Sequence, residues 1–169
     1  MDLRKTILTE HSKANCNRIT QWVGQSQARF DDLFQLFMDD IELIRQRAAW
    51  PLSYAVIAHP VLIHKHFGKL LKNLDKPKLH TSVKRNTVRL LEQIDIPKKY
   101  QGRVMNACFR FITDSAEAAA VKAFSLTTLQ NLSRHYPEII QELKLIIEVR
   151  WDQESAAFRS RAKNILKEL

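Results

Sequence analysis

Three histidines lie close together in the sequence, and imidazole nitrogens at short spacing can ligate a metal ion. They are His59, His64 and His66. On a helix, His64 and His66 point about 200° apart, so they cannot share one metal ion without distortion. His59 precedes Pro60 and is interpreted as a helix-start residue. We therefore predict no metal site in this segment.

Paired carboxylates and thiols are the other candidates for chemistry. Asp31 and Asp32, and likewise Asp39 and Asp40, are adjacent, so on a helix each pair diverges by about 100° and suits helix ends or solvent. Two cysteines, Cys16 and Cys108, have no CxxC spacing and are interpreted as structural thiols. The sequence contains no Gly-rich phosphate loop, GxSxG or HExxH motif. We predict no catalytic residue, no cofactor and no enzymatic activity.

Composition favours one all-helical domain. Hydrophobic residues make up 45% of the 169 residues and charged residues 27%, which is an ordinary globular mixture. Three glycines and five prolines are too few for the many turns of a β-sandwich. No apolar run approaches the length of a membrane span, and the N-terminus lacks the apolar segment of a secretory signal. These features predict a cytoplasmic protein.

A repeated pattern organises the chain. Four twelve-residue segments begin at residues 44, 83, 121 and 158, and each has an apolar first residue, a basic second, a small fifth and a leucine ninth. Positions 0, +4, +8 and +11 fall on one helical face, which we expect to be buried. The residues at these positions are Ile44, Ala48, Leu52 and Ala55; Val83, Thr87, Leu91 and Ile94; Val121, Ser125, Leu129 and Leu132; and Phe158, Ala162, Leu166 and Leu169.

A second amphipathic helix is predicted before each of these segments. The ranges are 28–40, 59–74, 97–113 and 137–151, and three of them begin at Pro60, Pro97 and Pro137. A capping helix is expected at 2–23. The predicted organisation is a single domain over 1–169, with a cap over 1–25 and repeats over 28–57, 59–95, 97–134 and 137–169. Pro51 lies inside the first segment and predicts a kinked or locally irregular helix.

The helix pairs resemble HEAT/armadillo-like α-solenoids, in particular small stand-alone bacterial HEAT-like proteins. The resemblance covers about residues 28–169 and is strongest in "DIELIRQRAAWPL", from Asp40 to Leu52. It implies a right-handed all-α solenoid of about four helix pairs, a curved stack whose second helices line the concave side and often bind partners. HEAT repeats commonly place an acidic residue before the basic one, and here Asp40 fits, while Asp114 and Asp152 lie further upstream.

The face opposite the predicted core carries aromatic and basic residues. Positions +2, +6 and +9 are expected to be the most exposed, with a shoulder at +3 and +10. The four segments contain ten Lys or Arg residues and two acids, a net charge of +8 in a chain of net charge +9. We predict that this surface binds a partner through Arg47, Trp50, Tyr54, Arg85, Arg89, Phe124, Arg161 and Asn164.

Three classes of function fit this surface. The favoured one is a protein-interaction module or scaffold that captures a protein or peptide, an acidic one suiting the charge. The second is nucleic-acid binding, with cations on phosphates and Trp50 or Tyr54 stacked on a base. This class includes a resemblance to HEAT-like DNA alkylation repair glycosylases. The four segments contain no Asp, which argues against a glycosylase. The third is assembly through the ends of the stack.

Overall fold

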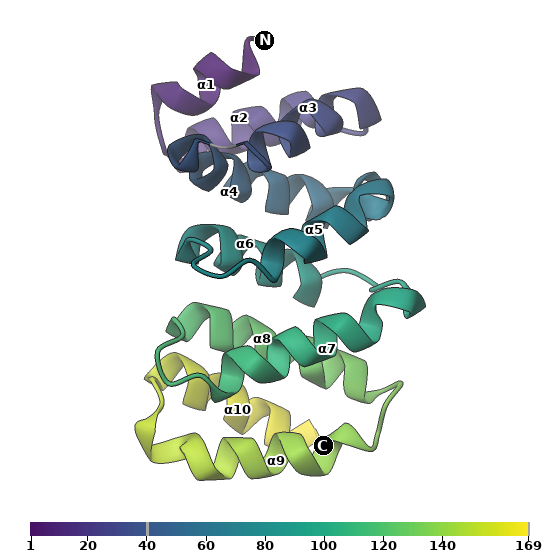
Figure 1. Ribbon diagram of the computed structural model, residues 1–169, viewed down its shortest axis with the longest axis vertical. Coiled ribbons are helices and arrows are strands. Elements are labelled where there is room, and N and C mark those ends of the chain that lie inside the picture. The colour runs from purple at the N-terminus through teal and green to yellow at the C-terminus, as the bar shows by residue number, and fades with distance from the viewer. Residues whose placement is uncertain (40, 169) are drawn as a thin grey trace. The chain divides into compact units, whose positions relative to one another are not determined.

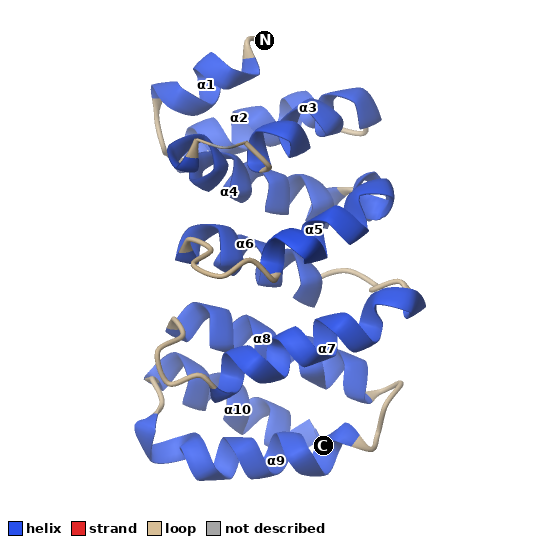
Figure 2. Cartoon of the chain, in the orientation of Figure 1, coloured by secondary structure: helices blue, strands red, loops and turns tan. Residues whose placement is uncertain are grey.

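The computed structural model describes residues 1–39 and 41–168, and every regular element in these ranges is helical (Figure 2). This confirms the predicted all-α fold. The chain divides into two compact units, Met1–Asp95 and Ile96–Leu169, called here the N-terminal and C-terminal units. The handedness of the solenoid, the number of helix pairs and the single-domain organisation with its repeat boundaries stay predictions.

The N-terminal unit is built around one long central helix. Its elements are α1 (Leu3–Thr9), α2 (Lys13–Val23), α3 (Gln27–Phe37), α4 (Glu42–Ala58), the 3-10 helix η1 (Pro60–His66), α5 (Phe67–Leu74) and α6 (Thr81–Glu92). Helix α4 packs against α2, α3 and α6, and α1 also contacts it (Figure 1). Two faces of α4 are therefore buried rather than one.

The predicted single capping helix at 2–23 is wrong, because the segment forms two helices. The side chain of Ser12 accepts a hydrogen bond from the Asn15 N–H and so starts α2 as its N-cap. The side-chain amide of Asn15 donates to the backbone carbonyls of Thr6 and Glu10, which holds the end of α1 in place. These bonds stabilise the turn between the two helices.

The predicted helix at 59–74 is also divided. Its first half is the 3-10 helix η1, which begins with a hydrogen bond from the Leu62 N–H to the His59 carbonyl, three residues apart. The α-helical half, α5, has its apolar residues on one face, and Phe67, Leu70 and Leu71 are buried there. The apolar period of 3.6 residues thus begins only at Phe67.

Helix α4 continues through Pro51. Pro51 is buried and lies in a helix that extends from Glu42 to Ala58. Two residues after Pro51, the Ser53 hydroxyl donates to the Trp50 carbonyl at 2.8 Å. The helix is continuous across Pro51, so the predicted local irregularity is not observed. A bend of the helix axis stays a prediction.

The C-terminal unit also has a central helix, α8. It contains α7 (Lys98–Thr113), α8 (Ala119–Ser133), α9 (Ile139–Arg150), the short 3-10 helix η2 (Trp151–Gln153) and α10 (Ala156–Glu168). Helix α8 packs against α7 and α10, and α9 contacts α7 and α8. Within this unit α9 and α10 lie on the same side of α7 and α8 (Figure 1).

The predicted core stripe is buried almost throughout. In α4, Ile44, Ala48, Leu52 and Ala55 are at most 1% exposed, and the corresponding residues of α8 are also buried. The exceptions are Ile94, which is half-buried, and Leu166, which is 39% exposed while its neighbour Ile165 is buried. Leu169 and Asp40 lie outside the described residues.

Some positions predicted to be exposed are buried. Ser53 and Glu92 at +9, Ala123 at +2 and Asn86 on the shoulder all lie inside the units. For Ser53 and Asn86 the reason is the packing of α4 against α6, because the Ser53 hydroxyl donates to the side-chain oxygen Oδ1 of Asn86 at 3.4 Å. Polar residues fit there because they bond to one another.

Candidate interaction site

Two of the residues predicted to bind a partner are aromatic and lie one turn apart on α4. The rings of Trp50 and Tyr54 have centroids 6.3 Å apart, and both residues are half-buried. Helix α2 adds a cation, because the Lys13 ammonium lies 3.8 Å from the Tyr54 ring centroid and 5.8 Å from that of Trp50. His11 packs edge-on against Trp50 at 5.4 Å. Helix α4 therefore presents two neighbouring aromatic rings, tilted against each other by 40°, with a cation near both.

Helix α6 brings further positive charge to the same rings. The Arg89 guanidinium lies 5.9 Å from the Tyr54 ring centroid, and its Nη1 donates to the Asn86 side chain at 3.3 Å. Arg85 lies one turn earlier on α6, on the same helical face, and is half-buried. We call Lys13, Trp50, Tyr54, Arg85 and Arg89 the aromatic–basic patch.

The electrostatics of the patch are set by these cations. The pKa of the Tyr54 hydroxyl is lowered, first by a hydrogen bond from Lys13 and further by the positive charges of Lys13 and Arg89. Positive charge that favours a phenolate also favours an anion from another molecule. Electrostatic attraction therefore favours the binding of an acidic group at the patch.

An apolar hollow adjoins the patch between α2 and α4. It is open to solvent, has a volume of about 250 Å³ and is lined by Asn17, Thr20, Gln21, Tyr54, Ile57 and Ala58. Its size suits one large apolar side chain rather than a whole small-molecule ligand. Tyr54 belongs to both the patch and the hollow, so one partner can occupy them together.

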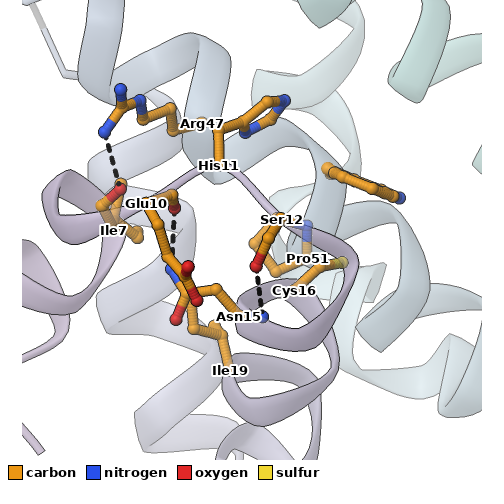
Figure 3. A pocket seen from close by; sticks show the side chains of 10 residues that line it. Ile7, Glu10, His11, Ser12, Asn15, Cys16, Ile19, Arg47 and Pro51 are labelled. Carbon is orange, nitrogen blue, oxygen red and sulfur yellow. Dashed lines mark hydrogen bonds between the residues drawn. The ribbon is translucent and has the colours of Figure 1, made fainter.

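Arg47 is predicted to bind a partner, and in the structure its guanidinium bonds to the backbone of α1. Its Nη1 donates to the carbonyl of Leu8 at 2.7 Å. It also donates to the carbonyl of Ile7 at 3.4 Å (Figure 3). These are carbonyls at the C-terminal end of α1, where cations are favourable. The small pocket beside Arg47 and Trp50 has a volume of about 10 Å³, room for no more than about one water molecule. Arg47 therefore anchors α1, and a contact between Arg47 and a partner stays a prediction.

The remaining predicted residues lie in the C-terminal unit. The Arg161 guanidinium of α10 lies 5.8 Å from the Phe124 ring centroid on α8, and its Nη1 donates to the Thr127 hydroxyl at 2.6 Å. Asn164 is exposed one turn after Arg161. The structure thus brings Phe124 and Arg161 together in a second aromatic–basic pair.

Sequence reasoning missed the two residues that the N-terminal segment contributes. His11 and Lys13 come from the turn into α2, more than thirty residues before Trp50. The available signal was Ser12, a helix N-cap residue that marks a change of chain direction. It predicts where α2 begins but not which helix α2 covers.

Two residues of the histidine segment contact the carboxylate of Asp31 on α3. His66 Nε2 lies 2.7 Å from Asp31 Oδ1, its ring stacks on Phe34 at 4.2 Å, and Lys65 Nζ lies 2.5 Å from Asp31 Oδ2. Burial raises the pKa of Asp31, but hydrogen bonds from Lys65, His66 and Gln27 outweigh it and lower the pKa to about 2. Among the described residues no three His, Cys, Asp or Glu side chains gather as metal ligands.

The two thiols are buried and carry no disulfide. Burial raises the pKa of Cys16 to about 11, against smaller opposing effects of Lys13, Thr20 and Arg89. Burial likewise raises the pKa of Cys108 to about 12. Neither thiol is a nucleophile near neutral pH, because the thiolate is the reactive form.

Comparison with known proteins places these helices in a family. No described helix combines the length and apolarity needed to cross a bilayer. No curated protein and no solved structure matches the chain. A family model for the HEAT repeat domain matches residues 3–169. The chain therefore belongs to the HEAT repeat domain family.

Proposed function

We propose that the chain is a non-enzymatic, cytoplasmic interaction module that binds an acidic segment of a partner protein at the aromatic–basic patch. The observation that carries the proposal is the position of the Lys13 ammonium and the Arg89 guanidinium over the Tyr54 ring, at 3.8 Å and 5.9 Å from its centroid. Membership of the HEAT repeat family supports it, since that fold commonly serves as a scaffold for protein interactions.

The chemistry of the patch favours a carboxylate next to an apolar residue. Lys13, Arg85 and Arg89 supply positive charge, and Trp50 and Tyr54 supply apolar area at little cost in side-chain entropy. The hollow beside Tyr54 accepts one apolar side chain. An acidic peptide with a single leucine or aromatic residue among its acids is therefore the partner that fits best.

The pair formed by Phe124 and Arg161 offers a contact of the same kind in the C-terminal unit. Its half-buried aromatic ring, guanidinium and exposed Asn164 repeat the residue types of the aromatic–basic patch. We propose it as a further contact point for acidic segments. Binding there is expected to be weaker, because this pair has one arginine and one ring.

Single-stranded nucleic acid is the second candidate. A base stacked on Tyr54 would leave Lys13 and Arg89 near its phosphates, because both cations flank that ring. A glycosylase activity gains no support from the described residues. The two acids of the second-helix segments are Glu92, which is buried, and Glu168, which accepts a hydrogen bond from Gln130.

Fluorescence anisotropy separates the two candidates. The probes are a labelled glutamate-rich peptide with one leucine, the same peptide with serine in place of leucine, and labelled single-stranded DNA, duplex DNA and RNA, at about 50 and 200 mM salt. The account predicts that the leucine peptide binds, that the serine peptide binds more weakly, and that the nucleic acids do not bind at 200 mM salt. Tight nucleic-acid binding with a steep salt dependence would overturn it.

A charge-reversal variant locates the site. Arg85→Glu with Arg89→Glu is expected to weaken peptide binding at least tenfold, since both charges face the patch. The matched control is Lys69→Glu with Lys72→Glu, two exposed lysines of α5 in the same unit. Equal losses in both variants would show that net charge, rather than the patch, controls binding.

A further inference from the structure

Helix α9 carries an apolar face that the C-terminal unit does not cover. Ile139, Leu143 and Ile147 are buried against the unit, whereas Leu145 and Val149 are 60% and 68% exposed. Leu145 and Val149 are four residues apart and so lie side by side on the opposite face. Two large apolar residues exposed together on one helix indicate a contact surface.

The borders of this apolar face are acidic. Glu142 and Glu148 flank Leu145 and are exposed, while the two cations of α9, Lys144 and Arg150, are half-buried. In a chain of net charge +9, a helix face with exposed acids and no exposed cation is unusual. Its complement is a helix that presents lysines or arginines around an apolar residue.

The chain itself supplies such a helix in the same unit. On α10, Lys163 and Lys167 are exposed one turn apart, and Leu166 next to them is 39% exposed although its repeat position predicts burial. Helices α9 and α10 lie on the same side of α7 and α8 (Figure 1). An isologous interface would place both helices of one copy against the same two helices of a two-fold related copy.

We propose that the chain forms a two-fold homodimer in which the α9 face of each copy packs against the α10 face of the other. Leu145 and Val149 bury apolar area against Leu166 of the second copy. Glu142 and Glu148 lie opposite Lys163 and Lys167 of the second copy. Each contact occurs twice, which doubles the apolar area and the number of charge pairs. This surface contains no residue of the aromatic–basic patch, so failure of the dimer leaves the proposed binding at that patch untouched.

Sedimentation equilibrium of the full chain tests the dimer. The wild type is expected to be dimeric at micromolar concentration, and Leu145→Glu with Val149→Glu is expected to raise the dimer dissociation constant at least tenfold. Because both residues are exposed, the far-UV circular dichroism spectrum should stay unchanged, which shows that the variant retains its helical fold. The control is Val61→Glu, an exchange at a residue 64% exposed in the N-terminal unit, which should leave the dimer intact. A monomeric wild type, or equal loss in both variants, would overturn the proposal.

A charge exchange tests the pairing of the two helices. Glu142→Lys with Glu148→Lys, and separately Lys163→Glu with Lys167→Glu, should each give monomers, because each homodimer would then oppose like charges. Mixing the two variants should restore a dimer, since every contact in the mixed pair joins opposite charges. A mixture that stays monomeric while the wild type dimerises would overturn the pairing of α9 with α10.

Discussion

The ammonium of Lys122 lies 2.7 Å from the carboxylate of Glu154, and both side chains are 4% exposed. Arg150 bonds to the same carboxylate at 2.6 Å and donates to the carbonyl of Thr113 at 2.9 Å. Lys122 is the basic second residue of the third repeat segment, and it takes part here in a buried ion pair that joins α8 to the turn before α10. A buried pair of this kind is costly to break on one side only.

The first prediction concerns this ion pair. Glu154→Leu leaves Lys122 buried without its anion, and we expect a loss of about 3–5 kcal/mol in the free energy of unfolding. Lys122→Met combined with Glu154→Leu should recover much of the loss, because no unpaired charge remains at Lys122. Urea denaturation measures both, with Asp152→Leu, an exposed acid of η2, as the matched control. A Glu154→Leu variant as stable as the control would refute the role of the pair.

The second prediction concerns acid stability at Asp31. Its folded pKa of about 2 lies below the ordinary value of 3.8, so the ionised carboxylate stabilises the fold. This contribution is fully present above pH 3.8 and is lost as the pH falls through about 2. The stability difference between wild type and Asp31→Asn should therefore shrink on acidification below pH 3.8. Urea titrations over the pH range in which both proteins fold measure it, and a difference independent of pH would contradict the account.

The third prediction concerns the two thiols. Because burial raises the pKa of Cys16 to about 11 and that of Cys108 to about 12, neither should react with a thiol reagent in the folded protein at mildly alkaline pH. Both should react on unfolding in urea. Ser160→Cys, at an exposed position of α10, provides the reactive control. Fast labelling of either native cysteine would show that its surroundings open readily.

The fourth prediction concerns the attachment of α1. Arg47→Ala removes the bonds to the carbonyls of Ile7 and Leu8, and hydrogen bonds to charged groups contribute about 1.5–3 kcal/mol each. Amide hydrogen exchange in α1 should therefore accelerate about tenfold or more, while exchange in α4 changes little. Arg4→Ala is the comparison, since Arg4 is paired with Asp39 in a more exposed bridge of 2.8 Å and should have the smaller effect. Equal effects would remove the special role of Arg47.

The repeat could be predicted from the sequence because it rests on local periodicity. The spacing of Ile44, Ala48 and Leu52 is a property of one helix, and all three are buried as expected. The family could be predicted for the same reason, since four segments share one pattern. The exposure of the opposite face could not, because it depends on which helices cover it. Ser53 and Asn86 are polar residues that meet between α4 and α6.

The candidate site shows the same division between local and long-range information. Trp50 and Tyr54 could be paired from their spacing on one helix, and Arg85 and Arg89 likewise. Lys13 could not be assigned to them, because its contact with Tyr54 depends on the packing of α2 against α4. Glu154 was missed because sequence reasoning looked for an acid upstream of each basic residue, whereas the acid that pairs with Lys122 follows η2, downstream of it.

The central claim is that an acidic peptide binds at the aromatic–basic patch. Two-dimensional ¹H–¹⁵N NMR during titration with the glutamate-rich leucine peptide tests it most directly. The account predicts that the largest shifts occur at Lys13, Tyr54 and Arg89 and at Thr20 and Ile57 of the adjoining hollow. Shifts centred on Lys69 and Lys72 of α5, or no shifts at saturating peptide, would contradict it.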